Sequence, residues 1–334
     1  MRWRWFVQQV LGGVRRIPGA RARVVTGGAL EDGRCSLGVT ADSVRDLCSG
    51  EAPVLVCRGA LPASLCEQAA ERLEAVASLG SAKSGGRATQ FAHWYLGADA
   101  QAPASDYTKL GYAKTDVFRE EGVRMAAGRG APERYLRRAQ ETRRFLDESV
   151  FAPHRSPISQ IAEELSALPG ISCRLERCPA TGRDFLPCVV RRMVAGERRP
   201  AGNLHMDTAV PGRTLSVNVY LRVPEGDAAG GELVLYPVRK DALSRVLNSH
   251  FFTTVEIQNF YPGRSFYTDG LLASRQIEPI VYRPSPGDVV FIDPAYPHAV
   301  RDFQPASSCP ARISLQTFVQ ISRQGGESVF EYAV

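Results

Sequence analysis

The spacing of apolar residues changes at about residue 170, and the change divides the chain into a helical part and a strand-rich part. Upstream, apolar residues recur every three or four positions, which predicts amphipathic helices. These helices are expected over residues 61–79, 131–150 and 158–168. Ser64 is placed to cap the first helix, and Pro169 and Gly170 end the last.

Two further features precede the strand-rich part. A β-branched run over residues 53–60 predicts a strand that ends at a glycine turn. Residues 80–115 mix glycine, serine, alanine and aromatic residues without a period. We interpret them as a long loop region on the substrate side of the protein.

Beyond residue 170, apolar and polar residues alternate, which predicts β-strands. The expected strands cover residues 187–195, 203–208, 214–223, 231–238, 277–283, 288–293, 298–303 and 312–321. Glycine and proline turns separate them, and many short strands with such turns favour a sandwich or a barrel. Residues 239–276 are interpreted as an insertion that could hold a short helix near residues 240–248.

Two of these strands have one polar and one apolar face, because side chains alternate along a strand. The polar face of the strand over 214–223 carries Thr214, Ser216, Asn218 and Tyr220. That of the strand over 312–321 carries Arg312, Ser314, Gln316 and Phe318. An antiparallel sheet with one solvated side gives this pattern. A barrel whose lumen holds an anion, with its other face packed on the upstream helices, gives it too, and both interpretations stay open.

The bulk composition is that of an ordinary soluble globular protein, with 334 residues, 44% of them apolar and 23% charged. This length suits one large domain or two small ones. The net charge of +6 is spread over many arginines without a long basic tract, so nucleic-acid binding is not indicated. A preference for anionic substrates is one interpretation of the charge, and an arginine-rich composition without a partner is the favoured one.

The cysteines and the amino-terminal segment bear on location. None of the eight cysteines forms a C-x-x-C pair, and a chain of this length needs no disulfides, so reduced thiols in the cytoplasm are expected. Residues 1–24 are basic, but their apolar stretch is interrupted and lacks a clear cleavage pattern. A short helix packed on the domain, or a frayed arm, is favoured over a helix at a membrane surface. No apolar run is long enough to span a membrane.

The chemistry of the chain is concentrated in His205-Met206-Asp207 and the distant His298. On a strand, His205 and Asp207 share a face, and a second histidine from another strand would complete three metal ligands. Two imidazoles and one carboxylate leave one side of a metal open, as non-haem Fe(II) oxygenases require. Arg312 follows on the last long strand, where its fork of donors could bind a carboxylate.

Other motifs accompany these residues in a fixed order. After H-x-D come Gly230-Gly231-Glu232-Leu233, then Pro286-Gly287-Asp288, then His298, and finally Arg312-x-Ser314. Over roughly the carboxyl-terminal half, this order resembles that of the Fe(II)/2-oxoglutarate-dependent oxygenases. The resemblance implies a mainly β fold with flanking helices, in which a double-stranded β-helix (a cupin-like jelly-roll) follows the amino-terminal helices.

The resemblance also implies the roles of the site residues and the cofactors. His205, Asp207 and His298 would bind Fe(II), and Arg312 with Ser314 would bind the distal carboxylate of 2-oxoglutarate. Oxidation of the substrate would use O2 and convert 2-oxoglutarate to succinate. Asn218 and Tyr220, on the polar face of their strand, are expected to join the co-substrate site.

The ligand set favours a type of reaction. In the halogenases of this family a small residue replaces the acidic ligand, whereas here Asp207 is present. Hydroxylation is therefore favoured, with desaturation, ring closure or epimerisation as other oxidations. The expected substrate is a small molecule of amino-acid or natural-product metabolism. Candidate substrate contacts are His93, Trp94, Tyr112 and Arg191, for which local packing or a solvated face is the competing interpretation.

We expect residues 1–50 to form a basic extension and residues 51–334 to form one domain. Within it, a helical and loop part over 51–170 precedes a jelly-roll core over 171–334. Two other functions remain open: a jelly-roll binding protein without catalysis, and a zinc-type hydrolase or isomerase with the same ligands. Neither of these functions uses a co-substrate, so neither explains why Arg312 and Ser314 occur together. The sequence leaves the oligomeric state and the site of oxidation open.

Overall fold

The computed structural model describes residues 15–16, 20–27, 35–82, 94–96, 108–114, 131–194, 213–224, 230–239, 277–301 and 311–334. Its helices are α2 (Ala41–Ser49), α3 (Ala63–Ala82), α5 (Glu133–Phe145) and α6 (Pro157–Ser166), with a π-helical turn η1 (Leu146–Val150) continuing α5. The three predicted helices are confirmed. The cap predicted at Ser64 is wrong, because the amide of Cys66 already donates to the carbonyl of Pro62 and Ser64 lies inside the first turn.

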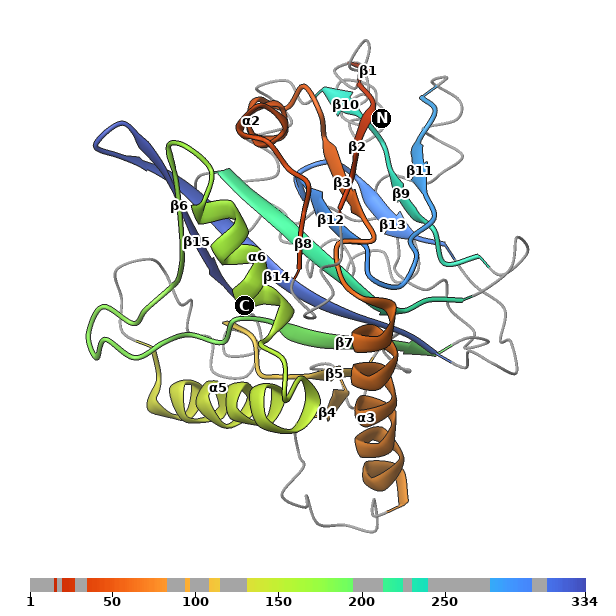
Figure 1. Cartoon of the computed structure of the whole chain (residues 1–334), viewed down its shortest axis with the longest axis vertical. Coiled ribbons are helices and arrows are strands. Elements are labelled where there is room, and N and C mark those ends of the chain that lie inside the picture. Colours follow the sequence, from red (N-terminus) through yellow and green to blue (C-terminus); the bar gives the residue numbers. More distant parts are fainter. Residues whose placement is uncertain are drawn as a thin grey trace, which may run out of the picture.

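The described residues form one large, mostly antiparallel sheet. Its strands run in the order β2 (Ala22–Thr26), β3 (Val54–Arg58), β12 (Val289–Ile292), β8 (Arg213–Arg222), β14 (Ala311–Gln324), β7 (Val189–Val194), β5 (Thr108–Leu110) and β4 (Trp94–Leu96). A further strand β15 (Glu327–Ala333) pairs with β14, and β6 (Ile171–Leu175) pairs with β15. The long strand β14 therefore lies at the centre, between β8 and β7 (Figure 1).

A small sheet packs against the large one. Its described strands are β11 (Ile280–Tyr282), β9 (Leu233–Leu235) and β13 (His298–Val300), in that order and antiparallel. Val56 and Val290 of the large sheet share one buried cluster with Leu233, Leu235 and Tyr282 of the small sheet. The protein is thus mainly β with flanking helices, as expected, and two sheets enclose an interior between them.

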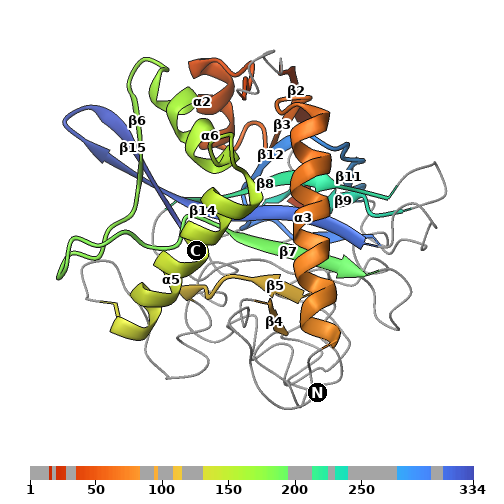
Figure 2. The ribbon, with the colours of Figure 1, turned by 60° about the horizontal axis from the view of Figure 1, so that its bottom comes forward.

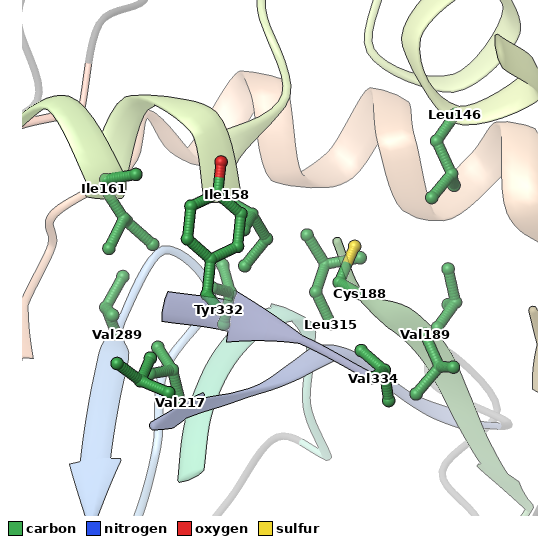
Figure 3. Close-up of a cluster of buried hydrophobic side chains, with 14 of the residues drawn as sticks. Leu146, Ile158, Ile161, Cys188, Val189, Val217, Val289, Leu315, Tyr332 and Val334 are labelled. Atoms are coloured by element: carbon green, nitrogen blue, oxygen red, sulfur yellow. The ribbon is translucent and has the colours of Figure 1, made fainter. Parts of the chain in front are cut away.

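The opposite face of the large sheet is covered by helices. Figure 2 shows α3, α5 and α6 across β14, β8 and β7. Val217 of β8 and Leu315 of β14 lie in one buried cluster with Ile158 and Ile161 of α6 and Leu146 of η1 (Figure 3). The apolar faces of the two long strands therefore pack on the helices, as the barrel interpretation of the alternation predicted.

The Pro286-Gly287-Asp288 motif connects the two sheets. The buried Asp288 carboxylate accepts hydrogen bonds from the Gly59 amide at 2.9 Å, the Ser285 amide at 2.7 Å and the Tyr282 hydroxyl at 2.5 Å. Gly287 has φ +89°, and a Cβ there would lie 2.5 Å from the Leu61 carbonyl oxygen. This turn therefore admits only glycine without rearrangement, and it fixes the start of β12 against both sheets.

Several elements differ from the sequence-based expectation. Residues 80–115 were interpreted as loop, yet β4 and β5 lie within them and extend the large sheet through β7. Strands of three residues are too short to show a period. Strands β1 (Arg15–Arg16) and β2 contradict the helix or frayed arm expected over residues 1–24, insofar as these residues are described.

The elements α2, β6 and β15 were not predicted at all. The described residues of 1–50 join the main body, since β2 pairs with β3 and Leu47 of α2 is buried in the helix-side cluster. The strand expected over 203–208 and the helix near 240–248 lie outside the described residues. No helix in the described ranges is long and apolar enough to cross a membrane.

Candidate functional site

Arg312 is a buried cation on the inner face of β14. Its side chain is 4% exposed, its Nη1 donates to the Met193 sulfur at 3.3 Å, and its guanidinium carbon lies 4.9 Å from the centre of the Tyr220 ring. Among the described residues, its Nε has no hydrogen-bond partner, and no carboxylate forms an ion pair with it. Arg312 therefore stacks on Tyr220, a polar-face residue of β8, and has no acidic partner in the described ranges.

The electrostatics of Arg312 favour an anion beside it. Burial lowers the pKa of its guanidinium, the charge of Arg191 lowers it further, and Tyr220 acts in the opposite direction. Arginine nonetheless stays charged in proteins. A buried charge that lacks its partner is costly, typically by about 3–5 kcal/mol, so this position fits a ligand that brings a carboxylate.

The neighbours of Arg312 form a polar surface between the sheets. Ser314 is buried and lies in register with Tyr220 of β8 on one side and Arg191 of β7 on the other. Next along β14, the Gln316 amide donates to the Ser216 hydroxyl oxygen at 3.2 Å. Asn218 donates to the same oxygen at 3.3 Å. Within the described residues, Gln316 Oε1 is buried without a partner.

The inner face of the large sheet is polar only in part. Toward β3 and β12 it is lined by aliphatic side chains that pack on the small sheet, namely Val54, Val56, Val290 and Ile292. Toward β14 and β7 it carries Arg312, Ser314 and Arg191 instead. The polar groups are therefore gathered on one side of the interior, which suits a ligand that enters with its charged end.

His298 lies in the small sheet and faces the same interior. It is 6% exposed and in register with Leu235, a member of the cluster between the sheets. Its Nδ1 lies 2.8 Å from the Tyr296 carbonyl oxygen. Because a carbonyl can only accept, Nδ1 carries the proton, and the lone pair of the neutral ring lies on Nε2. This is the tautomer of a histidine that binds a metal through Nε2.

The other two predicted metal ligands precede β8 in the sequence. His205 and Asp207 lie outside the described residues, so the triad stays a prediction. Within the ranges that are described, no three side chains of His, Cys, Asp or Glu are grouped as a metal site would require. His298 is consistent with the prediction in position, burial and tautomer.

The predicted substrate residues have different locations. His93 and the side chain of Trp94 lie outside the described residues, although the backbone of Trp94 pairs with Leu110. Tyr112 is buried in the helix-side cluster, with its ring centre 6.4 Å from that of Tyr135 and Arg138 stacked on it at 4.6 Å. The structure does not bring Tyr112 together with Arg312.

Arg191 and its neighbour Arg192 face opposite sides of β7. Arg191 pairs in register with Ser314, on the inner face. Arg192 points to the helices and forms an ion pair with Glu74 of α3 at 3.0 Å. Of the two, only Arg191 lies with the candidate site.

Sequence reasoning missed the contacts of Met193 and Tyr296. Met193 reaches Arg312 through the register of β7 with β14, and sequence alone does not supply that register. Tyr296 accepts through its backbone carbonyl, which every residue possesses. By contrast, Ser216 and Gln316 belonged to the polar faces predicted by alternation.

Comparison with known proteins adds a structural likeness only. No protein-family model and no curated protein sequence matches the chain. Solved structures that are similar to it include members of the 2-oxoglutarate–Fe(II) oxygenase family.

One similar structure is an oxidoreductase of that family from Burkholderia pseudomallei, with a TM-score of 0.38, 16% identity, and coverage of 88% of this chain and 93% of that one. A prolyl-4-hydroxylase from Pseudomonas putida has a TM-score of 0.37 and 15% identity, covering 83% and 96%. An N-substituted L-amino acid dioxygenase from Burkholderia ambifaria, solved with α-ketoglutarate, has a TM-score of 0.37 and 12% identity, covering 68% and 86%. At such scores the likeness establishes neither the fold nor the activity of this chain.

Proposed function

We propose that this protein is an Fe(II)- and 2-oxoglutarate-dependent oxygenase that oxidises an unactivated C–H bond of a small molecule. The observation that carries the proposal is the buried Arg312, which has no carboxylate partner among the described residues and faces the same interior as His298. A carboxylate held at Arg312 and a metal held at His298 together require a ligand with a charged end and a chelating end. 2-Oxoglutarate has both.

The order of strands supports a double-stranded β-helix. The large sheet contains β12, β8, β14 and β7 as consecutive neighbours, and the small sheet contains β11, β9 and β13. A jelly-roll consists of eight strands in two sheets, so one strand of the small sheet is still to be assigned. The strand predicted over residues 203–208 would fill that place beside β13 and bring His205 and Asp207 to His298.

The residues present fit the implied cofactor. His298 has the tautomer of a metal ligand, and His205 and Asp207 would complete a set of two histidines and one carboxylate. When bound, Fe(II) with 2-oxoglutarate supplies the activation of O2 for oxidation of the substrate. Asp207 favours hydroxylation or a related oxidation over halogenation, because a carboxylate occupies the position that a halide would need.

The side chains around Arg312 would orient the co-substrate. The Arg312 guanidinium binds the distal carboxylate, and the Ser314 hydroxyl lies two residues further along the same face to donate to it. The Tyr220 ring packs on the guanidinium and fixes its plane. These contacts hold the charged end in the sheet, so the keto-acid end is directed away from β14.

The test of this function is the formation of succinate and CO2 from 2-oxoglutarate by the purified full chain with Fe(II) in air. We expect slow turnover without a substrate and faster, coupled turnover with the right small molecule from a panel of amino acids and natural-product scaffolds. A zinc-type hydrolase or a binding protein would form no succinate in either condition, and that result would refute the proposal.

A further inference from the structure

We infer that Arg191 is a second cation of the carboxylate site, so that the distal carboxylate of the co-substrate is bound between two guanidinium groups. The inference rests on the proposed function, because it concerns the same interior. The resemblance to oxygenases assigns this carboxylate to Arg312 with Ser314 and gives no role to Arg191. The role of Arg191 follows from the register of β7 with β14.

The register places the two arginines around one serine. Arg312 pairs with Met193, and Ser314 pairs with Arg191, so Arg191 is the diagonal neighbour of Arg312 on the same face. Diagonal neighbours in an antiparallel ladder lie roughly 7–8 Å apart, within reach of long side chains. An anion that accepts from Arg312 and Ser314 therefore lies within reach of Arg191 as well.

The charges of the two arginines act on each other. Burial lowers the pKa of the Arg312 guanidinium, and the charge of Arg191 lowers it further. The Nε atom of Arg191 is itself buried, so this pair of like charges lies in a partly desolvated region. A carboxylate placed between the two guanidinium groups would be attracted by both positive charges and would therefore be bound more strongly than by Arg312 alone.

Arg192 shows that this role is specific to one position of the strand. It follows Arg191 directly in β7 but pairs in register with Ile313, on the helix side. Its guanidinium already binds the Glu74 carboxylate through Nε and Nη2 at 3.0–3.1 Å. Arg192 therefore serves as the matched control: the same residue type on the same strand, facing the other way.

The experiment compares Arg191→Met with Arg192→Met in the Fe(II)-loaded full chain under anaerobic conditions. Two ligands are titrated, 2-oxoglutarate and 2-oxobutyrate, and the metal-to-ligand charge-transfer band reports binding of the keto-acid end. Only 2-oxoglutarate has a distal carboxylate. Thermal unfolding of both variants checks that each is folded, and Arg191→Lys tests whether a charge alone restores binding.

We expect Arg191→Met to weaken 2-oxoglutarate binding by about tenfold or more, the value of one charge-assisted hydrogen bond, and to leave 2-oxobutyrate binding unchanged. Arg192→Met should leave both affinities within about twofold of wild type. Arg191→Lys should recover part of the loss, since it keeps the charge without the planar fork.

Three results would overturn the inference. Unchanged 2-oxoglutarate binding in Arg191→Met would exclude Arg191 from the carboxylate site. If this variant also released less succinate in the presence of substrate, Arg191 would instead contact an anionic substrate. Equal weakening of both ligands would indicate a structural role at the metal. The first two results would leave the proposed function standing. If the wild-type protein binds neither keto acid, the proposed function fails together with the inference.

Discussion

Arg192 and Arg312 lie on the neighbouring strands β7 and β14 but face opposite sides of the large sheet. On the helix side, the Arg192 side chain is 20% exposed and is neutralised by Glu74 of α3. On the inner side, Arg312 is 4% exposed and has no carboxylate partner in the described ranges. The chain supplies its own counter-charge where two layers pack permanently. Where the interior takes a ligand, we propose that the ligand supplies the counter-charge.

The other side chains on the helix side and on the inner side of the large sheet differ in the same way. Leu215, Val217 and Leu315 pack on the helix side without a polar atom, as a stable core requires. Ser314 and Gln316 are buried on the inner side, and Gln316 Oε1 has no partner within the part of the chain that the structure describes. A buried acceptor is destabilising unless something binds it. The helix side is therefore mainly apolar, although Thr317 Oγ1 is buried there without a partner among the described residues, whereas the inner side gathers Arg312, Ser314 and Gln316.

The largest effect is expected from Asp207→Ala, which removes the only acidic ligand of the proposed metal site. Succinate formation from 2-oxoglutarate should fall to background, and less iron should remain bound after gel filtration, because one carboxylate contributes both charge and coordination. Asp147→Ala, which removes a carboxylate from η1 on the helix side, is the control and should keep both. Wild-type turnover by Asp207→Ala would show that Asp207 is not a ligand.

A smaller effect is expected from Arg312→Lys. Lysine keeps the positive charge but lacks the planar pair of donors, and it cannot stack on Tyr220 as the guanidinium does. The affinity for 2-oxoglutarate should fall by about tenfold, while iron binding is retained. If the affinity is unchanged, the site recognises charge alone and the bidentate geometry has no role.

The smallest effect is expected from Glu74→Gln on the helix side. The change removes the counter-charge of Arg192 in a pair whose side chains are 20% and 19% exposed. The free energy of unfolding should decrease by about 1 kcal/mol, since the pair is still partly solvated. Chemical denaturation measures the loss, and the 2-oxoglutarate affinity should not change. If Glu74→Gln also weakened 2-oxoglutarate binding, the helix side and the inner side of the sheet would not be independent.

The sequence predicted the two faces of β8 and β14 because both strands are long enough for alternation to be read. It named Arg191 as a candidate substrate contact, but the residues that Arg191 faces depend on the register of β7 with β14. The same register determines the contact of Met193 with Arg312. Strands β4 and β5 are too short to show a period, and their pairing with β7 comes from distant parts of the chain.

The helix α2 has a clear local signal in the sequence at both of its ends. Thr40 and Ser43 form a reciprocal capping box, and Gly50 ends the helix with φ 84°. Tertiary packing then buries Leu47 in the helix-side cluster. For the site, alternation placed Arg312 and Tyr220 on the polar faces of their strands, and the structure brings the two side chains together. The co-substrate site and the metal triad stay predictions.

We propose above all that Arg312 is kept for the carboxylate of a ligand. Anaerobic titration of 2-oxoglutarate into Fe(II)-loaded wild type, Arg312→Ala and Arg192→Ala, followed by the charge-transfer band, tests it most directly. The account predicts that Arg312→Ala loses about a hundredfold to a few thousandfold in affinity, the equivalent of 3–5 kcal/mol, with iron still bound. Arg192→Ala should bind as wild type does. Undiminished binding by Arg312→Ala would contradict the account.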